Sequence, residues 1–97
     1  MINENNRVVR KDDEFYANIP VDSPVKDSFI QTADLIESFK SNFSEKISIA
    51  DIGCATGVLV NYLMSRFPRD RIIGYEYLER LVKVGKQNFP NIQINQA

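Results

Sequence analysis

The sequence contains no histidine and only one cysteine in its 97 residues. The absence of histidine excludes imidazole catalysis and histidine-ligated metal sites within this chain. A single cysteine excludes an internal disulfide and any multi-cysteine zinc site, so we expect no metal centre. A lone thiol is also typical of a reducing compartment, which predicts a cytoplasmic location.

The sequence also lacks an excess of either charge: it has 12 Lys and Arg residues and 13 Asp and Glu residues, which give a formal net charge of −1. No basic field is available to hold a phosphate backbone, so we expect no nucleic-acid partner. The first 15 residues contain no apolar run that would act as a signal peptide. No later stretch approaches the roughly 20 apolar residues that span a bilayer, so we expect no membrane association.

The N-terminal part of the chain differs in composition from the rest. Residues 1–14 are polar and charged, and we expect them to form a flexible tail because they have little to bury. Residues 15–97 are expected to be part of one small domain. Within them, residues 15–20 are apolar enough to predict a short element that folds over another part of the molecule. Its Tyr16 is expected to pack against the fold, and closure over a ligand is the alternative.

A helix is predicted after this short element. Ser23 and Pro24 are typical of a helix start, because serine caps free N–H groups and proline suits the first helical position. Apolar side chains then recur at steps of three and four residues, which places them on one helical face. They are Phe29, Ala33, Ile36, Phe39 and Phe43.

Strand-like and helix-like patterns alternate in the rest of the chain. The expected strands cover residues 47–52, 72–76 and 92–94, and the expected helices cover residues 57–67 and 78–89. Each of these helices ends at a proline. The helical spacing predicts Tyr62, Phe67 and Phe89 as core residues. Alternation of this kind predicts an α/β fold with a parallel sheet and helical crossovers.

The most informative stretch is DIGCATG at residues 51–57, which joins a predicted strand to the following helix. Glycine reaches backbone angles closed to other residues and lets a ligand approach the main chain. The start of the helix presents unpaired N–H groups and the positive end of its dipole, so the pattern predicts a ligand site. Cys54 is expected to be a small packing residue here and not a nucleophile, because no base lies near it in the sequence.

Two classes of adenosine cofactor bind at such loops. The dinucleotide fingerprint needs three glycines in a GxGxxG spacing, whereas this loop has only Gly53 and Gly57. Asp51 stands two residues before the first glycine, where an acid would repel a pyrophosphate. The same acid would suit a cofactor with a positive amine and a positive sulfonium. The loop therefore favours S-adenosylmethionine over NAD.

A second acid supports this interpretation. Glu76 ends the second predicted strand, nineteen residues after Gly57. In a strand–helix–strand unit this position faces the ribose, and a carboxylate there can accept both hydroxyl hydrogens. The next residue, Tyr77, is expected to lie against the adenine face.

Residues 51–57 resemble the first motif of the class I S-adenosylmethionine-dependent methyltransferases. Gly74-Tyr75-Glu76, followed by Leu81-Val82 and Gly85-Lys86, resembles their second motif. The resemblance covers roughly residues 45–97. It implies a Rossmann-like fold of about seven strands, of which this chain would supply the first three.

The resemblance also implies roles for six residues of the two motifs. Gly53, Cys54, Ala55 and Gly57 would form the turn under the methionine part of the cofactor. Asp51 would act near the cofactor's amino group, and Glu76 would hold the ribose. Ala55 departs from the pattern, because the family often has a second glycine at this position.

The function implied is the cofactor-binding half of a methyltransferase that methylates an acceptor, for which we expect a small molecule. These positions explain cofactor binding and no step of acceptor chemistry, so no catalytic residue is assigned. We expect a partner or a further C-terminal segment to complete the sheet, and the 97 residues alone to be inactive. The alternative is a truncated, non-catalytic module for cofactor binding or assembly. The third hypothesis is half of an NAD-dependent oxidoreductase, which the missing third glycine disfavours.

Overall fold

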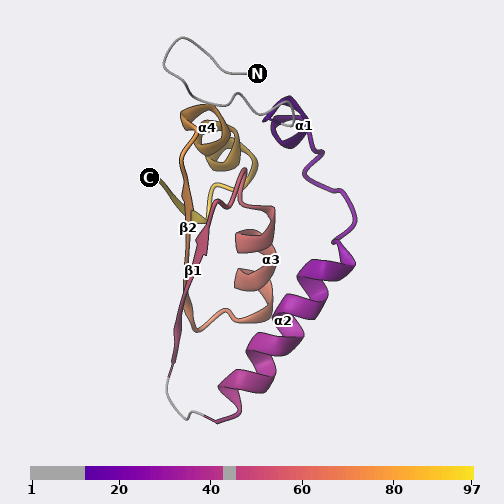
Figure 1. The fold of residues 1–97 in the computed structure, drawn as a ribbon, viewed down its shortest axis with the longest axis vertical. Helices are drawn as coiled ribbons and strands as arrows, with labels where there is room; N and C mark the ends of the chain where they lie inside the picture. The colour runs from indigo at the N-terminus through magenta and orange to yellow at the C-terminus, as the bar shows by residue number, and fades with distance from the viewer. Residues whose placement is uncertain (1–12, 43–45) are drawn as a thin grey trace, which may run out of the picture.

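The computed structural model describes residues 13–42 and 46–97. Within these ranges the chain alternates between helices and strands, as Figure 1 shows. The helices are α1 (Asp13–Ala17), α2 (Asp27–Lys40), α3 (Val58–Arg66) and α4 (Glu79–Asn88). The strands are β1 (Ser48–Ile52), β2 (Arg71–Glu76) and β3 (Gln93–Gln96). The predicted strands and the last two predicted helices are therefore confirmed, with small shifts at their ends.

The three strands form one parallel sheet in the order β1-β2-β3. Asp51 of β1 is the register partner of Gly74 in β2, and Gly74 is in turn the partner of Ile94 in β3. The predicted α/β fold with a parallel sheet is confirmed. Because the strands are parallel, their carboxyl ends meet at one edge, where β1 and β2 end at Ile52 and Glu76.

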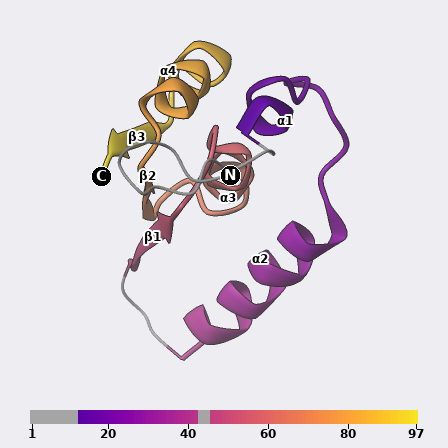
Figure 2. The ribbon, with the colours of Figure 1, turned by 45° about the horizontal axis from the view of Figure 1, so that its top comes forward.

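Helices α3 and α4 cover the same face of the sheet. A Cβ atom at Gly74 would lie 2.9 Å from Cγ2 of Val60 in α3, and a Cβ atom at Gly85 in α4 would lie 3.2 Å from Cδ1 of Ile94. Gly74 and Ile94 are register partners, so their side-chain positions point to the same side of the sheet. Helix α2 packs on the outer side of α3, and α1 lies against α4 (Figure 2).

The core lies between this face and the two helices. Phe67 and Phe89 are buried in it, as the helical spacing predicted, whereas Tyr62 is only partly buried. Val60, which the predicted pattern did not include, is completely buried. It fills the space that Gly74 leaves open on β2.

Helix α2 begins later than predicted. It starts at Asp27, with Lys26 in an extended conformation before it, and Lys26 makes no side-chain capping bond. Ser23 does not act as the cap, because Lys26 stands at the cap position and the helix begins only at Asp27. The N–H of Ser23 donates to the carbonyl of Pro20 in the preceding turn. Residues 23–26 therefore stay outside the helix, and Ser23, Pro24 and Lys26 line a cavity that is described below.

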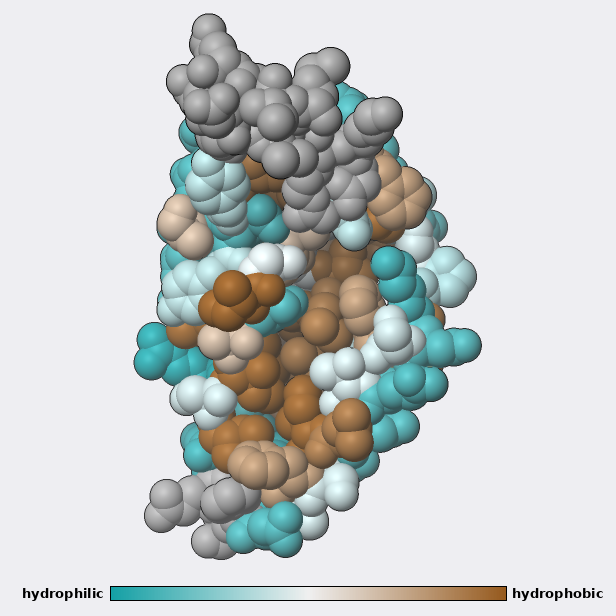
Figure 3. Space-filling model, viewed as in Figure 1, coloured by the Kyte–Doolittle hydropathy of each residue, from teal (hydrophilic) through white to brown (hydrophobic). Residues whose placement is uncertain are grey.

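The apolar face predicted for α2 is only partly buried. Ala33 is buried against the core, but Phe39 is 56% exposed, and Phe43 lies outside the described residues. Because α2 packs mainly on α3, only a narrow stripe of its surface is covered. Figure 3 shows apolar side chains gathered in a hollow between α2 and the strands.

The N-terminal boundary also differs from the expectation. Helix α1 begins at Asp13, so the last two residues of the predicted tail are helical. The side chain of Glu14 pairs with Arg80 of α4, with 2.7 Å between Oε1 and Nη1. Residues 1–12 lie outside the described residues. In the part of the chain that is described, no helix has the length and apolar character needed to cross a membrane.

Asp70 connects three elements at the far end of the sheet. Its side chain is nearly fully buried, pairs with Lys40 at the end of α2 and accepts a 2.9 Å hydrogen bond from the N–H of Ile47. The hydrogen bond from Lys40 and that from Ile47 hold the pKa of Asp70 below its ordinary value. The carboxylate thus fixes α2 and the start of β1 to the turn before β2.

Candidate functional site

The loop between β1 and α3 is built from three left-handed residues. Gly53, Ala55 and Gly57 have φ angles of 75°, 52° and 84°. Glycine adopts this region freely, but alanine does so at a cost of roughly 1 kcal/mol. The backbone angle at Ala55 gives a physical reason for the glycine that the methyltransferase motif often has there.

Main-chain hydrogen bonds fix the loop to the end of β2. The N–H groups of Gly53 and Cys54 donate to the carbonyl of Tyr75 over 2.8 and 3.1 Å. The N–H of Gly57 donates to the carbonyl of Cys54 over 2.9 Å. The loop is therefore a rigid bend at the carboxyl edge of the sheet.

Glu76 also holds this bend. Its side chain is 4% exposed, and Oε1 accepts a 2.8 Å hydrogen bond from the N–H of Ala55. Oε2 accepts a 2.9 Å hydrogen bond from the N–H of Leu78. A carboxylate has about four acceptor positions, and these two hydrogen bonds use two of them. The structure thus gives Glu76 a structural role that the sequence did not predict, beside the ligand role that it did.

Asp51 lies at the opposite side of the bend and is half-buried. Burial, and to a lesser extent the negative charge of Glu76, raise the pKa of Asp51. The two acids that the sequence singled out are therefore close enough to interact electrostatically. The edge of the sheet carries concentrated negative charge.

Cys54 lies between these acids and is buried. Burial, followed by the charges of Asp51 and Glu76, raises the pKa of Cys54 to about 12. Its Sγ lies 3.7 Å from the carbonyl oxygen of Ala55 and can donate to it. A thiol that stays protonated at neutral pH is a poor nucleophile, in agreement with the predicted packing role.

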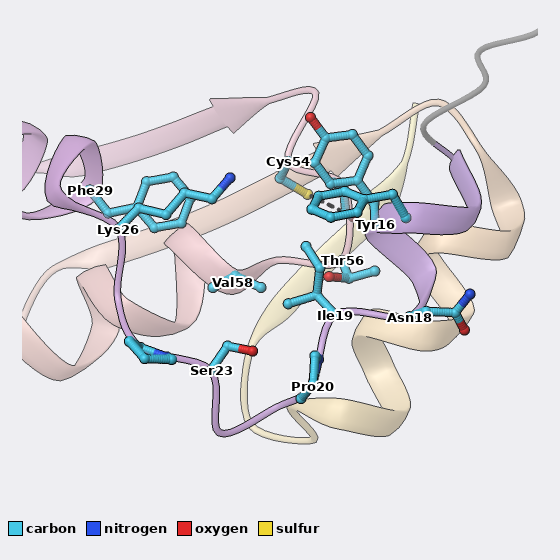
Figure 4. Close-up of a pocket in the computed structure, with 13 residues that line it drawn as sticks. Tyr16, Asn18, Ile19, Pro20, Ser23, Lys26, Phe29, Cys54, Thr56 and Val58 are labelled. Atoms are coloured by element: carbon cyan, nitrogen blue, oxygen red, sulfur yellow. Dashed lines mark hydrogen bonds between the residues drawn. The ribbon is translucent and has the colours of Figure 1, made fainter.

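Two adjoining cavities open beside the loop. The smaller, of about 210 Å³, is lined by Asp51, Gly53 and Leu59 together with five residues that it shares with the larger. The larger, of about 400 Å³, is mostly apolar (Figure 4). The shared residues are Tyr16, Lys26, Phe29, Cys54 and Ala55. The N-terminal segment and the loop, which are far apart in sequence, thus enclose one continuous site.

Asp51, Gly53, Cys54 and Ala55 line the cavities. Gly57, Glu76 and Tyr77 line neither cavity, although Glu76 accepts a hydrogen bond from the N–H of Ala55. Gly57 faces inward, because a Cβ atom there would lie 2.4 Å from Cδ1 of Ile92. Tyr77 lines neither cavity and is 55% exposed on the surface next to Glu76. Gly57 therefore shapes the bend from behind, and contact between Tyr77 and a ligand stays a prediction.

Sequence reasoning missed Lys26 and Phe29 as parts of the site. Phe29 was predicted only as part of the apolar face of a helix, Lys26 was not singled out, and no motif marks either residue. They reach the loop because residues 18–26 return the chain across it. Among the described residues, no three potential metal ligands of the Cys, Asp and Glu types lie together.

Comparison with known proteins gives one related sequence and a set of related structures. No protein-family model matches the chain. A protein of Invertebrate iridescent virus 6 named "Putative methyltransferase 235L" is 28% identical over 71 residues. The match covers 67% of this chain and 27% of the viral protein.

The related solved structures include several methyltransferases. DesVI of Streptomyces venezuelae has a TM-score of 0.57 at 21% identity, and the match covers 72% of this chain and 29% of DesVI. The amino pentose methyltransferase CalS10 of Micromonospora echinaspora, solved with S-adenosylmethionine, has a TM-score of 0.59 at 19% identity over 74% of this chain and 30% of its own. The plantazolicin methyltransferase BpumL, solved with a monoazolic desmethylPZN analog and SAH, has a TM-score of 0.57 at 25% identity, and the match covers 72% of this chain and 27% of BpumL.

These matches confirm the resemblance that the two motifs implied. The chain spans about 30% of the length of the proteins that it matches, and the matched region is their N-terminal part. The three parallel strands and their helices correspond to the first part of the methyltransferase sheet. The chain therefore has the Rossmann-like fold of the N-terminal part of the S-adenosylmethionine-dependent methyltransferases.

Proposed function

We propose that this protein binds S-adenosylmethionine and transfers its methyl group to a small-molecule acceptor. The observation that carries the proposal is the pair of carboxylates, Asp51 and Glu76, on either side of a rigid glycine bend. The fold of the matched methyltransferases supports it. The activity and acceptor of the whole protein are part of the proposal, because the chain spans about 30% of those relatives.

The charge of the site fits this ligand. Burial and Glu76 raise the pKa of Asp51, which means that its negative charge is poorly neutralised in the folded protein. A ligand ammonium next to Asp51 would stabilise that charge. A dinucleotide would instead bring a negative pyrophosphate toward two acids, which the same field would repel.

The remaining predicted residues fit the rest of the ligand. Glu76 keeps two acceptor positions, which suffice for two ribose hydroxyls. The surface at Gly53 is open, since a Cβ atom built there would meet no atom within 4 Å. Cys54 and Ala55 would lie under the methionine part, and the exposed ring of Tyr77 would cover the adenine.

The larger cavity is the proposed place for the acceptor. Its volume of about 400 Å³ is in the usual range for small-molecule sites. The bound cofactor supplies an activated methyl group that an acceptor atom displaces directly. The apolar wall from Phe15, Ile19 and Phe29 would exclude water and orient the acceptor toward the smaller cavity. No residue of the described chain is assigned as a catalytic base.

Three further parts of the proposal concern the setting of the protein. The net charge of −1 supports an acceptor other than nucleic acid. The single, unpaired cysteine, Cys54, supports a reducing compartment such as the cytoplasm. In the described part of the chain β1 pairs with β2 alone, which supports a further strand or a partner along its other edge.

Titration of the purified protein tests the proposal. S-adenosylmethionine and S-adenosylhomocysteine should bind saturably, and NAD should not. Asp51→Asn, which keeps the shape of the side chain, should weaken both adenosyl ligands about tenfold or more. Asp34→Asn, at an exposed site on α2, is the matched control and should change neither affinity. Binding of NAD alone, or adenosyl binding that Asp51→Asn leaves intact, would contradict the proposal.

A further inference from the structure

Helix α2 has a smaller apolar interface than α3 and α4. Of its 14 residues, all of which the structure describes, only Ala33 is buried, and Leu35 and Phe39 are 73% and 56% exposed. The shorter helices α3 and α4 bury two and three residues. Helix α2 lies on the outer side of α3, away from the sheet (Figures 1 and 2). Little apolar surface therefore holds it in place.

Arg66 of α3 forms the weaker of two charged links to α2. Its Nη2 lies 3.1 Å from Oδ1 of Asp34 and 3.4 Å from Oε2 of Glu37. These carboxylates are 64% and 70% exposed, and exposed ion pairs are weakened by water and salt. This link therefore orients α2 on α3 without holding it strongly.

Lys40 and Asp70 form the stronger link. Lys40 lies in the last turn of α2, and Asp70 lies in the turn before β2 with a side chain that is only 1% exposed. The Nζ of Lys40 also lies 5.1 Å from the centroid of the Phe67 ring. A buried carboxylate that loses its cation is strongly disfavoured. The Lys40–Asp70 pair thus fastens the C-terminal end of α2.

The opposite end of α2 lies at the candidate site. Phe29, in its first turn, lines both cavities and is only partly buried (Figure 4). Lys26, which precedes the helix, makes no side-chain capping bond. A movement of α2 away from α3 would therefore remove Phe29 from the wall of both cavities.

We propose that α2 opens as one unit away from α3 while the sheet stays folded, and that the Lys40–Asp70 pair holds it closed. Segments with few buried apolar contacts open at a lower free energy than the core. Opening of α2 gives a ligand access to the cavities, and closing returns Phe29 to their wall. The inference rests on the proposed function only where it concerns a ligand.

Amide hydrogen exchange of the protein at several low urea concentrations tests the opening. The amides of α2 should exchange at least about tenfold faster than those of the central strand β2. Their exchange should also depend less on urea, because undocking one helix exposes less surface than unfolding the whole chain. Equal rates and equal urea dependence in α2 and β2 would overturn the inference, because α2 would then open only on global unfolding.

Substitution of Lys40 tests the ion pair. Lys40→Met should speed the exchange of the α2 amides about tenfold or more, because it leaves the Asp70 carboxylate buried without a cation. Lys83→Met, which removes an exposed ion pair within α4, is the matched control and should change α2 exchange less than about twofold.

An Asp70→Asn background separates the ion pair from other effects of Lys40. In that background, Lys40→Met should change α2 exchange less than about twofold, because the charge that it leaves unpaired is already gone. An equal effect of Lys40→Met in both backgrounds, or no effect in either, would overturn the role of the pair.

S-adenosylhomocysteine at saturation tests the link between α2 and the site. It should slow the exchange of the α2 amides about tenfold or more, because the ligand favours the closed state. Binding that leaves α2 exchange unchanged would overturn the control of access and leave the proposed function standing. Absence of binding would overturn the proposed function and the control of access with it, whereas the opening of α2 and the role of the ion pair are measured without ligand.

Discussion

Gly85 provides a sharp test of how closely α4 packs against the ligand loop. A Cβ atom at this position would lie 2.6 Å from the carbonyl oxygen of Thr56 and 3.2 Å from Cδ1 of Ile94. Contacts below 3.0 Å are not tolerated without movement, and here the nearer atom belongs to the main chain of the loop. Gly85→Ala should therefore push α4 and the loop apart.

The expected magnitude follows from two opposing effects. In an ordinary helix interior, alanine is more favourable than glycine by about 1 kcal/mol. Overpacking of one extra methyl group into a close-packed region costs typically 1–3 kcal/mol. We expect the steric effect to exceed the helical gain, so that Gly85→Ala loses up to about 2 kcal/mol of unfolding free energy. With a urea m-value near 1–2 kcal/mol/M, the midpoint should fall by roughly 1 M.

Urea unfolding compares alanine with glycine at two positions of the same helix. At the exposed Lys83, the Lys83→Ala variant should be more stable than Lys83→Gly by about 1 kcal/mol, as helix propensity requires. At Gly85 the order should be reversed. Adding Ile94→Val to Gly85→Ala should not restore stability, because the closer contact is with the Thr56 main chain. If Gly85→Ala is as stable as the original protein, the described packing of α4 on the loop is wrong.

Three further predictions concern the loop itself. Residues 53 and 55 both have positive φ, so glycine should be more stable than alanine at each position. The unfolding free energy of Ala55→Gly should be unchanged or up to about 1 kcal/mol higher, and that of Gly53→Ala about 1 kcal/mol lower. Urea unfolding measures both variants, and the opposite order of stability would refute the backbone argument. Burial and Glu76 raise the pKa of Asp51, so ionised Asp51 destabilises the folded state, and the unfolding free energy should fall as pH rises through that raised pKa. Asp51→Asn should therefore unfold at a higher urea concentration than the original protein at pH 7. An unchanged urea midpoint would argue against a destabilising charge at Asp51. Because the pKa of Cys54 is raised to about 12, iodoacetamide should modify the native protein at pH 7.5 much more slowly than the urea-unfolded chain; equal rates would contradict its burial.

The sequence predicted the sheet and the loop well because their signals are local. Asp51, Gly53 and Gly57 form a contiguous motif, and the strand–helix alternation around them leaves few possible topologies. Glu76 was found in the same way, from its place at the end of the next strand. Its hydrogen bond to the N–H of Ala55 was not predicted, because that contact depends on how the loop folds back on β2.

The N-terminal segment was predicted less well because its structure depends on tertiary contacts. Ser23 and Pro24 carry a local helix signal, yet the helix begins at Asp27, and both residues line the larger cavity instead. Lys26 has no motif and no periodicity to identify it. It belongs to the site only because the N-terminal segment brings it into the lining of the same cavity as Asp51.

A crystal structure of the protein with S-adenosylhomocysteine tests the central claim most directly. The proposal predicts that a carboxylate oxygen of Asp51 lies within hydrogen-bonding distance of the ligand ammonium, roughly 2.7–3.2 Å, directly or through one water. It also predicts that both ribose hydroxyls donate to Glu76. A bound ligand that leaves both carboxylates without contact to either group would contradict it.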